Sequence, residues 1–249
     1  MKKQLLILFT AAVAVLTGCK KDDDDSGSMK GKRVSKITEV DGDERSVIRF
    51  TYDSKNRISA YVNEGEGETA TFTYDGTGNL IKMEQSEETT KEVYEISYNS
   101  KGEPTTGTRK TFDGTELQSL EDITYTVSNG RVTEIKTSSE DEITGVHKIT
   151  YQGDNISKIE FEAEEGSYES TFSHDDKKSP FASAGFKYVL ELGISTRFWG
   201  KNNMTSIKGG LQETTASYTY DNDGYPRTSE VTVKLMEHQL SKTTQIYEY

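Results

Sequence analysis

Hydrophobic and polar residues alternate with a period of two along most of this chain. Ile48, Phe50 and Tyr52 occupy one set of alternate positions, and Arg49 and Thr51 occupy the other. Successive side chains of an extended strand point to opposite faces, so this pattern predicts a β-strand with one apolar and one polar face. The same alternation recurs in the groups Ala70/Phe72/Tyr74, Tyr94/Ile96/Tyr98, Ile123/Tyr125/Val127, Ile159/Phe161 and Val231/Val233/Leu235.

Many of the predicted strands end in one short turn motif, an aromatic residue followed by Asp or Asn and then by Gly or Asn. Asp and Asn side chains cap tight turns, and Gly or Asn accepts the positive φ that such turns need. Repetition of this hairpin unit predicts an all-β fold, an antiparallel meander of about 14–16 strands curled into an open or closed barrel-like sheet. The motif occurs in Tyr52–Asn56, Tyr74–Gly78, Tyr98–Gly102 and Tyr220–Gly224, with a diverged copy in Phe172–Lys178.

One segment, about residues 180–199, breaks the alternation and is the most apolar part of the chain after the N-terminal run. Ser179 is a suitable helix cap, and Pro180 suits the first helical position. Apolar residues then recur at helical spacing. We therefore expect one short helical insert, packed on the apolar face of the sheet. Its apolar stripe consists of Phe181, Ala184, Tyr188 and Leu192.

Residues 1–18 have the features of a signal peptide. Lysines follow Met1, an uncharged apolar run extends from Leu5 to Val15, and Gly18 precedes Cys19. This run is too short to cross a bilayer, which takes about 20 residues. The Leu-Thr-Gly-Cys sequence at its end resembles the lipobox of bacterial lipoproteins, which implies lipidation of Cys19. The alternative is an ordinary cleaved signal in which Cys19 is incidental.

Cys19 is the only cysteine of the chain, so no intramolecular disulfide can form. We expect residues 19–32 to be a lipidated cysteine with an acidic flexible tether, and residues 33–249 to be a single antiparallel β domain. The block Lys20–Asp25 looks like the export signal of Bacteroidetes lipoproteins. That resemblance implies a lipid anchor in the outer membrane and display at the cell surface, with the periplasmic leaflet as the alternative.

The chain is acidic, with a formal net charge of −12. Removal of Lys2 and Lys3 with the signal brings the net charge of the mature chain to about −14. A surface of this charge repels phosphate backbones and anionic lipid head groups. The composition therefore argues against nucleic-acid binding.

Two family resemblances rest on the repeats. The Tyr-Asp turn units resemble the YD repeats that build β-shells in bacterial toxin carriers. The chain as a whole is similar to a Bacteroidetes lipoprotein family of unknown function with a porin-like fold. This resemblance rests on the lipobox with its acidic tail, the repeated turns, the segment Asp175–Phe181 before the interruption and Lys201–Asn203 after it. It implies a curled, barrel-like antiparallel sheet and implies nothing about activity.

The outward faces of the predicted strands are charged. Arg49, Glu95 and Lys148 occupy polar positions of the alternation, whereas a barrel embedded in a membrane needs an outward apolar band. The C-terminal Tyr247–Tyr249 mimics the aromatic ending of outer-membrane barrels, but the preceding alternate residues are polar. We therefore expect an inward apolar face, a water-facing exterior and attachment through the lipid alone.

Residues suited to catalysis or metal binding are few. The three histidines, His147, His174 and His238, lie on separate repeats without the spacing of metal ligands. Asp221–Gly224 begins like a calcium loop but lacks the later ligands, so a turn is the better interpretation. No nucleophile elbow, zinc-protease motif or phosphate loop occurs in the sequence. We expect no enzyme activity, no metal and no cofactor.

The function that these features favour is a non-catalytic, lipid-anchored cell-envelope protein that binds a glycan or a protein. Phe186, Phe198 and Trp199 are the candidate binding residues, because clustered aromatic rings can form a platform for sugars. The competing interpretation of the same three residues is core packing beside the insert. The alternative function is a structural or assembly component of an outer-membrane complex.

Overall fold

The computed structural model of this protein describes residues 31–164, 166–193, 196, 198–236 and 238–249, which belong to one unit, Gly31–Tyr249. Cys19 and the predicted signal peptide lie outside the described residues. Sixteen antiparallel strands follow one another as a meander, which confirms the predicted all-β fold. The strands are β1 (Lys36–Asp41), β2 (Glu44–Tyr52), β3 (Ile58–Asn63), β4 (Glu68–Tyr74), β5 (Leu80–Glu87), β6 (Thr90–Tyr98), β7 (Pro104–Asp113), β8 (Glu116–Ser128), β9 (Arg131–Ser139), β10 (Glu142–Gln152), β11 (Asn155–Ala163), β12 (Gly166–Lys178), β13 (Asn202–Gly209), β14 (Gln212–Tyr220), β15 (Pro226–Leu235) and β16 (His238–Glu248).

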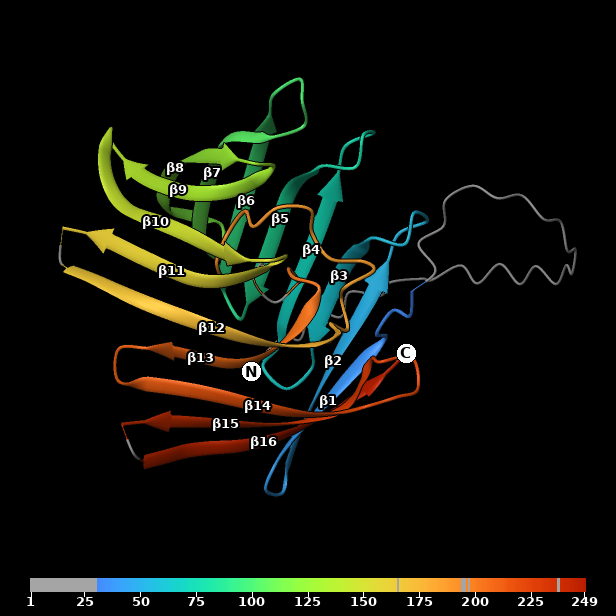
Figure 1. Ribbon diagram of the computed structural model, residues 1–249. Helices are drawn as coiled ribbons and strands as arrows, with labels where there is room; N and C mark the ends of the chain where they lie inside the picture. The colour runs from blue at the N-terminus through green and yellow to red at the C-terminus, as the bar shows by residue number, and fades with distance from the viewer. Residues whose placement is uncertain (1–30, 165, 194–195, 197, 237) are drawn as a thin grey trace, which may run out of the picture. The chain divides into compact units, whose positions relative to one another are not determined.

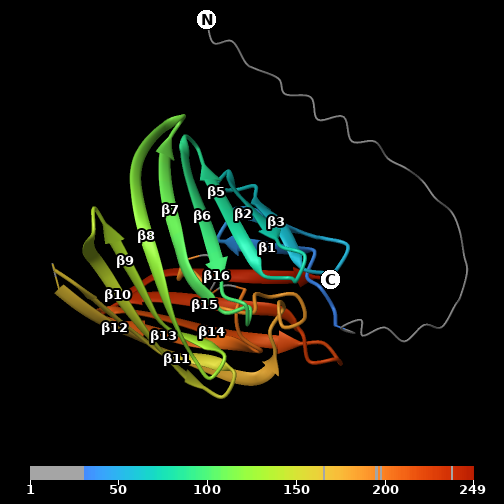
Figure 2. The same cartoon turned by 90° about the horizontal axis from the view of Figure 1, so that it is seen from above.

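The sheet closes into a barrel because its first strand pairs with its last. β1 lies between β2 and β16, and Ile37 stands opposite both Ile48 and Tyr247. Figures 1 and 2 show the resulting continuous wall of strands. A closed ring has no free strand edge, so the edge strands find backbone partners within the wall. The sequence was compatible with either an open or a closed sheet, and the structure shows the closed form.

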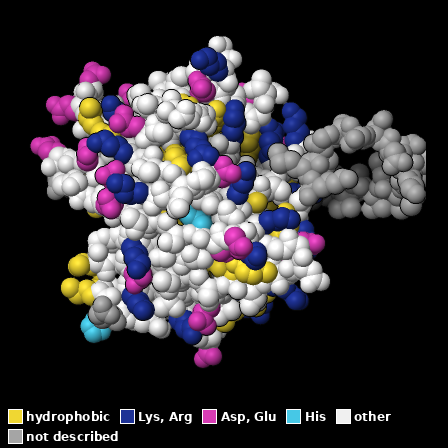
Figure 3. All heavy atoms as spheres, in the orientation of Figure 1, with side chains coloured by type: hydrophobic (Ala, Val, Ile, Leu, Met, Phe, Trp, Pro, Cys, Tyr) yellow, Lys and Arg dark blue, Asp and Glu magenta, His cyan; other side chains and the backbone are white. Residues whose placement is uncertain are grey.

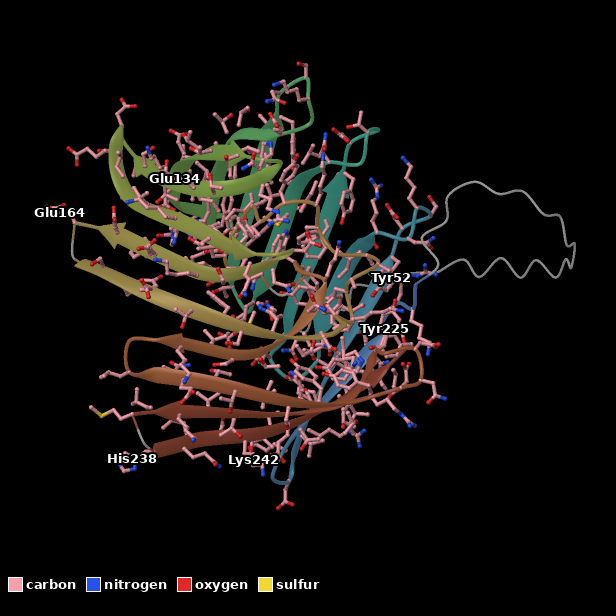
Figure 4. All side chains as sticks on the ribbon, viewed as in Figure 1. Tyr52, Glu134, Glu164, Tyr225, His238 and Lys242 are labelled. Carbon is pink, nitrogen blue, oxygen red and sulfur yellow. The ribbon has the colours of Figure 1, made fainter. Side chains whose placement is uncertain are left out.

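The barrel has two different ends. Loops that follow even-numbered strands lie at one end, the turn end, and connections that follow odd-numbered strands lie at the other, the hairpin end. In Figure 4, Tyr52 and Tyr225 mark the turn end, and Glu164 and His238 mark the hairpin end. The chain enters the barrel at the turn end, where the Lys32 ammonium lies 2.6 Å from the Asp221 carboxylate.

The Asp or Asn of each motif holds the turn by capping it. Asp53 Oδ1 accepts hydrogen bonds from the backbone N–H groups of Lys55 and Arg57, both at 2.9 Å. The residue that reverses the chain has a positive φ, 64° at Asn56, a conformation that Asn and Gly tolerate. The same pair of side-chain-to-backbone bonds recurs at Asp75, Asn99 and Asp221.

In three of the motifs, those of Tyr52, Tyr74 and Tyr98, the tyrosine fastens its strand to the beginning of the preceding strand, whereas Tyr220 donates to Asp175. Tyr98 Oη, for example, donates to the Leu80 carbonyl at 2.7 Å, across the β5–β6 pair. Such a bond satisfies a hydroxyl group that the wall has partly removed from water. The other bonds of this kind join Tyr52 to Val34, Tyr74 to Ile58, Tyr151 to Val132, Tyr218 to Met204 and Tyr249 to Pro226.

The outer face of the wall is polar and charged, as the alternation predicted. Arg49, Glu95 and Lys148 are all exposed. Basic and acidic side chains are interspersed over the face seen in Figure 3. Many of them form ion pairs across neighbouring strands, each of small energy because both partners face solvent. Examples are Lys110 with Glu95 at 2.8 Å, Lys148 with Glu162 at 2.8 Å, Lys208 with Glu213 at 2.8 Å and Lys242 with Glu230 at 3.0 Å.

The prediction of a helical insert over about residues 180–199 is wrong. Residues 179–201, here called the plug, join β12 to β13 through turns and bends in their described part, and they cross the interior of the barrel (Figure 1). A helix lying on a sheet buries only one stripe of its side chains. The plug, however, is surrounded by the barrel wall. Val189 and Leu190, which lie off the predicted stripe, are therefore as buried as Phe181. A Cβ at Gly185 would also collide with the Phe198 carbonyl, so this close approach requires glycine.

We predict that Tyr98→Phe lowers the free energy of unfolding by about 1–2 kcal/mol, because the Leu80 carbonyl loses its partner in a partly buried position. Urea unfolding measures the change. Tyr168→Phe is the control, since Tyr168 is 54% exposed and should change stability by less than about 0.5 kcal/mol. Equal effects of the two substitutions would contradict a structural role for the repeated tyrosine.

The lowered pKa of Asp75 predicts that the free energy of unfolding depends on pH. Burial raises the pKa of this carboxyl, but hydrogen bonds from Thr77, Asn79 and Gly78 outweigh burial and lower the pKa from 3.8 to about 2. The charged form therefore stabilises the fold above pH 3.8, and this contribution is lost as the pH falls toward 2.

Asp75→Asn keeps the capping oxygen, as Asn99 does naturally, but cannot titrate. The stability difference between wild type and Asp75→Asn should accordingly shrink as the pH is lowered through this window. Urea unfolding of both proteins over a series of pH values tests this, and an offset that stays constant with pH would rule it out.

Candidate functional site

The inner face of the barrel changes character between its two ends. Residues that stand opposite each other on paired strands share a face, so the pairs Phe50–Tyr61 and Phe72–Met83 place these side chains inside. Near the turn end the inner face is apolar and packs on the plug. Toward the hairpin end it carries carboxylates, amides and hydroxyls. The predicted inward apolar face therefore covers only part of the barrel.

Phe198 lies at the centre of an aromatic core. Its side chain is 1% exposed, and its ring centroid lies 4.8 Å from Phe181, 5.4 Å from Phe186 and 5.7 Å from both Phe72 and Tyr61. Phe186 is also buried, with its ring 5.0 Å from Phe72. Packing of this kind leaves no ring face open to a ligand. Of the two interpretations weighed for Phe186 and Phe198, the structure supports core packing.

Trp199 differs from the two phenylalanines because it is only half-buried and lines a cavity of about 210 Å³. Its ring lies 5.1 Å from that of Tyr151. His174 and Gln245 line the same cavity. Burial lowers the pKa of His174, and the neighbouring Asp175 carboxylate offsets part of that effect. Trp199 is thus the one member of the predicted aromatic set that borders open space.

Polar side chains on the inner wall, here called the polar belt, largely satisfy one another's hydrogen-bonding groups. Each carboxylate of this belt accepts a hydrogen bond from a neighbouring inward side chain. Burial raises the pKa of Tyr247, beside this belt, to about 12. The belt therefore holds the wall together and offers few unpaired groups. Its pairs are Ser46 with Asn63, Asn63 with Glu66, Tyr61 and Gln85 with Glu68, Tyr94 with Glu92, Arg109 with Glu121, and Gln245 with Glu39.

A second cavity, of about 230 Å³, lies beside the plug, between Leu190 and the inner wall of β6–β10. Arg109 and His147 line it, and the Arg109 guanidinium donates to Glu121 at 2.6 Å. Burial, and then the Arg109 charge, lower the pKa of His147. The imidazole is therefore neutral at neutral pH, and the Arg109 charge is balanced by Glu121.

A cavity of about 820 Å³ opens at the hairpin end between the β9–β10 and β11–β12 hairpins, and is here called the mouth. Phe161 and Tyr168 line it, with ring centroids 4.9 Å apart. The centroid of the His147 ring lies 4.5 Å from that of Phe161. These three residues stand opposite one another on β10, β11 and β12, so they form a continuous row on the inner face, here called the ring ladder.

The ring ladder was not identified as a site from the sequence. Alternation correctly placed Phe161 on an apolar face, and His147 attracted notice only as an isolated histidine. Tyr168 follows a turn glycine and carries no motif. Only the register of three strands brings these side chains together. Gly145 leaves room for the ladder, because a Cβ there would lie 2.7 Å from the Phe161 ring.

The remaining predicted sites have structural explanations or lie outside the described residues. Asp221 caps its turn and pairs with Lys32, in agreement with the turn interpretation. No group of three or more His, Cys, Asp or Glu side chains among the described residues is placed to hold a metal ion. No helix in this part of the chain is long and apolar enough to span a membrane. Cys19 falls outside the described part.

Neither a protein-family model nor a curated protein matches this chain. Among solved structures, it is similar to a porin-like protein from Bacteroides uniformis, at 17% identity and a TM-score of 0.57, over 86% of this chain and 96% of that one. A porin-like protein from Bacteroides vulgatus matches at 13% identity and a TM-score of 0.53, over 88% of this chain and 99% of that one. These likenesses establish the fold. A toxin structure, TcdB2-TccC3, matches at a TM-score of only 0.29 over 10% of its chain and supports no inference, so the resemblance to YD repeats stays a prediction.

We predict that Phe198→Ala lowers the free energy of unfolding by about 3–5 kcal/mol, the usual cost of removing a buried phenylalanine ring. Chemical unfolding followed by circular dichroism measures it. Leu240→Ala, at a side chain that is 61% exposed, is the control and should change stability by less than about 0.5 kcal/mol. A loss below about 1 kcal/mol for Phe198→Ala would show that the plug is not part of the core.

Proposed function

We propose that this chain is a non-catalytic protein of the bacterial cell envelope, anchored by lipid at Cys19 and exposed at the cell surface, that binds a ligand in the mouth of its barrel. The observation that carries the proposal is a closed barrel with a charged outer wall and an interior that the plug occupies near the turn end. Such a barrel is a poor membrane channel and a suitable rigid frame for a recess.

The charged outer wall supports attachment by lipid alone. A membrane-embedded barrel presents an apolar band about 25 Å tall, and Lys or Arg near the bilayer midplane costs about 2–4 kcal/mol each. Here ion pairs such as Lys110–Glu95 and Lys148–Glu162 occur on strands on different sides of the ring. A water-facing wall leaves the lipid predicted at Cys19 as the attachment to the outer membrane.

The position of the chain's entry supports an outward-facing mouth. Lys32 lies at the turn end, paired with Asp221, and the mouth lies at the hairpin end. The first described residues of the chain therefore join the barrel at the end opposite the mouth. This arrangement suits a receptor whose recess points away from the membrane.

The inner wall supports binding rather than catalysis or transport. Carboxylates of the polar belt, including Glu68 and Glu121, are engaged by neighbouring side chains. The plug packs against the apolar wall near the turn end and occupies that part of the interior. The mouth has a size that lies within the range of ligand pockets.

A second candidate function is assembly with another protein. Several hairpin tips expose large apolar side chains, and clusters of such side chains mark protein interfaces. The side chains concerned are Leu117, Ile143, Leu211 and Leu240, each at least half exposed. They surround the hairpin end, so a partner docked there would cover the mouth.

We predict that Cys19→Ala moves the protein from the washed membrane fraction to the soluble fraction and abolishes labelling by a radioactive fatty acid. Lipid is the proposed sole attachment, so no residual membrane fraction is expected. Protease treatment of intact cells tests display at the surface. Replacing Asp22 to Asp25 by serine should protect the protein from that protease while leaving lipid labelling intact. Retention of Cys19→Ala in washed membranes would refute the anchor.

A further inference from the structure

We propose that the ring ladder of Tyr168, Phe161 and His147 is a binding site for an uncharged saccharide. This inference rests on the proposed function, a ligand-binding mouth, and adds the site and the chemical class of the ligand. The mouth of about 820 Å³ is large enough for a short chain of sugar rings.

The geometry of the rings supports stacking. Neighbouring centroids are 4.9 Å and 4.5 Å apart, with interplanar angles of 37° and 34°, so the three rings form one row of tilted aromatic contacts that ends at Tyr168. Tyr168 is 54% exposed, and Phe161 is partly exposed. Exposed flat apolar surfaces in a recess match the flat, C–H-rich faces of pyranose rings.

The polar lining supplies hydrogen-bond acceptors and donors around the rings. Carboxylates of Glu140, Glu142 and Glu164 and hydroxyls of Ser139 and Ser167 line the mouth. None of these three carboxylates belongs to an ion pair among the described residues. A carboxylate accepts strong hydrogen bonds from hydroxyl donors, so it suits the hydroxyl groups of a sugar.

The charge of the mouth decides between neutral and anionic sugars. Its lining contains no Lys or Arg in the described part of the chain, and three carboxylates repel sulfate, phosphate or carboxylate substituents. Deeper in the barrel, Arg109 is neutralised by Glu121. The lowered pKa of His147 keeps that ring uncharged at neutral pH. An anionic saccharide would therefore find no counter-charge.

The test uses the mature lipidated protein in a detergent without a sugar head group, applied to a glycan array with neutral, sialylated and sulfated members. We expect binding to neutral glycans only. Calorimetry with the strongest neutral glycan then compares variants. Tyr168→Ala and Phe161→Ala should each weaken binding about tenfold or more, because each removes a stacking surface.

Two controls separate stacking from general damage. Tyr168→Phe keeps the ring and should bind within about twofold of wild type. Leu240→Ala removes an exposed apolar side chain from another hairpin and should bind like wild type. Melting temperatures of all variants confirm folding, and Tyr168→Ala is expected to fold because its side chain is largely exposed.

The outcomes distinguish the inference from the function on which it rests. Binding confined to sialylated or sulfated glycans, no binding to any neutral glycan, or neutral binding unchanged in both alanine variants would each overturn the saccharide site. All three results leave lipid anchoring and surface display intact, because the Cys19→Ala and protease experiments test those separately. Loss of anchoring with ladder-dependent glycan binding would instead overturn the proposed location alone.

Discussion

A ring of sixteen strands encloses more space than its own inward side chains fill, and this constraint governs the rest of the structure. Barrels of about eight strands are filled by their side chains, whereas wider barrels need an additional segment or remain open. Here the plug between β12 and β13 supplies the additional segment, and Phe198 packs at its centre among rings from the wall. The apolar inner face is confined to the turn end because the plug lies there, which leaves the hairpin end polar and open.

The repeated turn motif divides two tasks between adjacent residues. The Asp or Asn caps the turn, and in the copies at Tyr52, Tyr74 and Tyr98 the tyrosine ties its strand to the preceding one. Two other contacts hold the plug and the strand that follows it. Tyr125 donates to the Leu190 carbonyl of the plug at 2.8 Å. Asp175, in the diverged copy, accepts from the Asn203 backbone N–H at 3.1 Å and so ties β12 to the beginning of β13.

The shared fold with porin-like proteins does not by itself assign transport to this chain. The physical properties of the wall point elsewhere, because its outer face is charged and its interior is occupied near the turn end. In the proposed binding site, Tyr168 and Phe161 stand opposite each other on paired strands of the closed wall, which holds their backbones in register. Rigid positioning lowers the entropy lost on binding and is what a recognition site requires.

The sequence by itself determined the strands, the turns and the polar outer face, because period-two alternation and turn capping depend on residues a few positions apart. It also pointed to Cys19 and the acidic tether, which are local motifs. Tertiary structure decided the rest. Closure of the barrel depends on the pairing of Lys36 with Glu248, which lie far apart in the sequence. The local pattern of residues carries no information about that pairing. The plug resembled a helix in its spacing, but burial on every side favoured an irregular path. The ring ladder exists only because the registers of β10, β11 and β12 align three side chains from consecutive strands, and a shift of one residue would turn them to the other face.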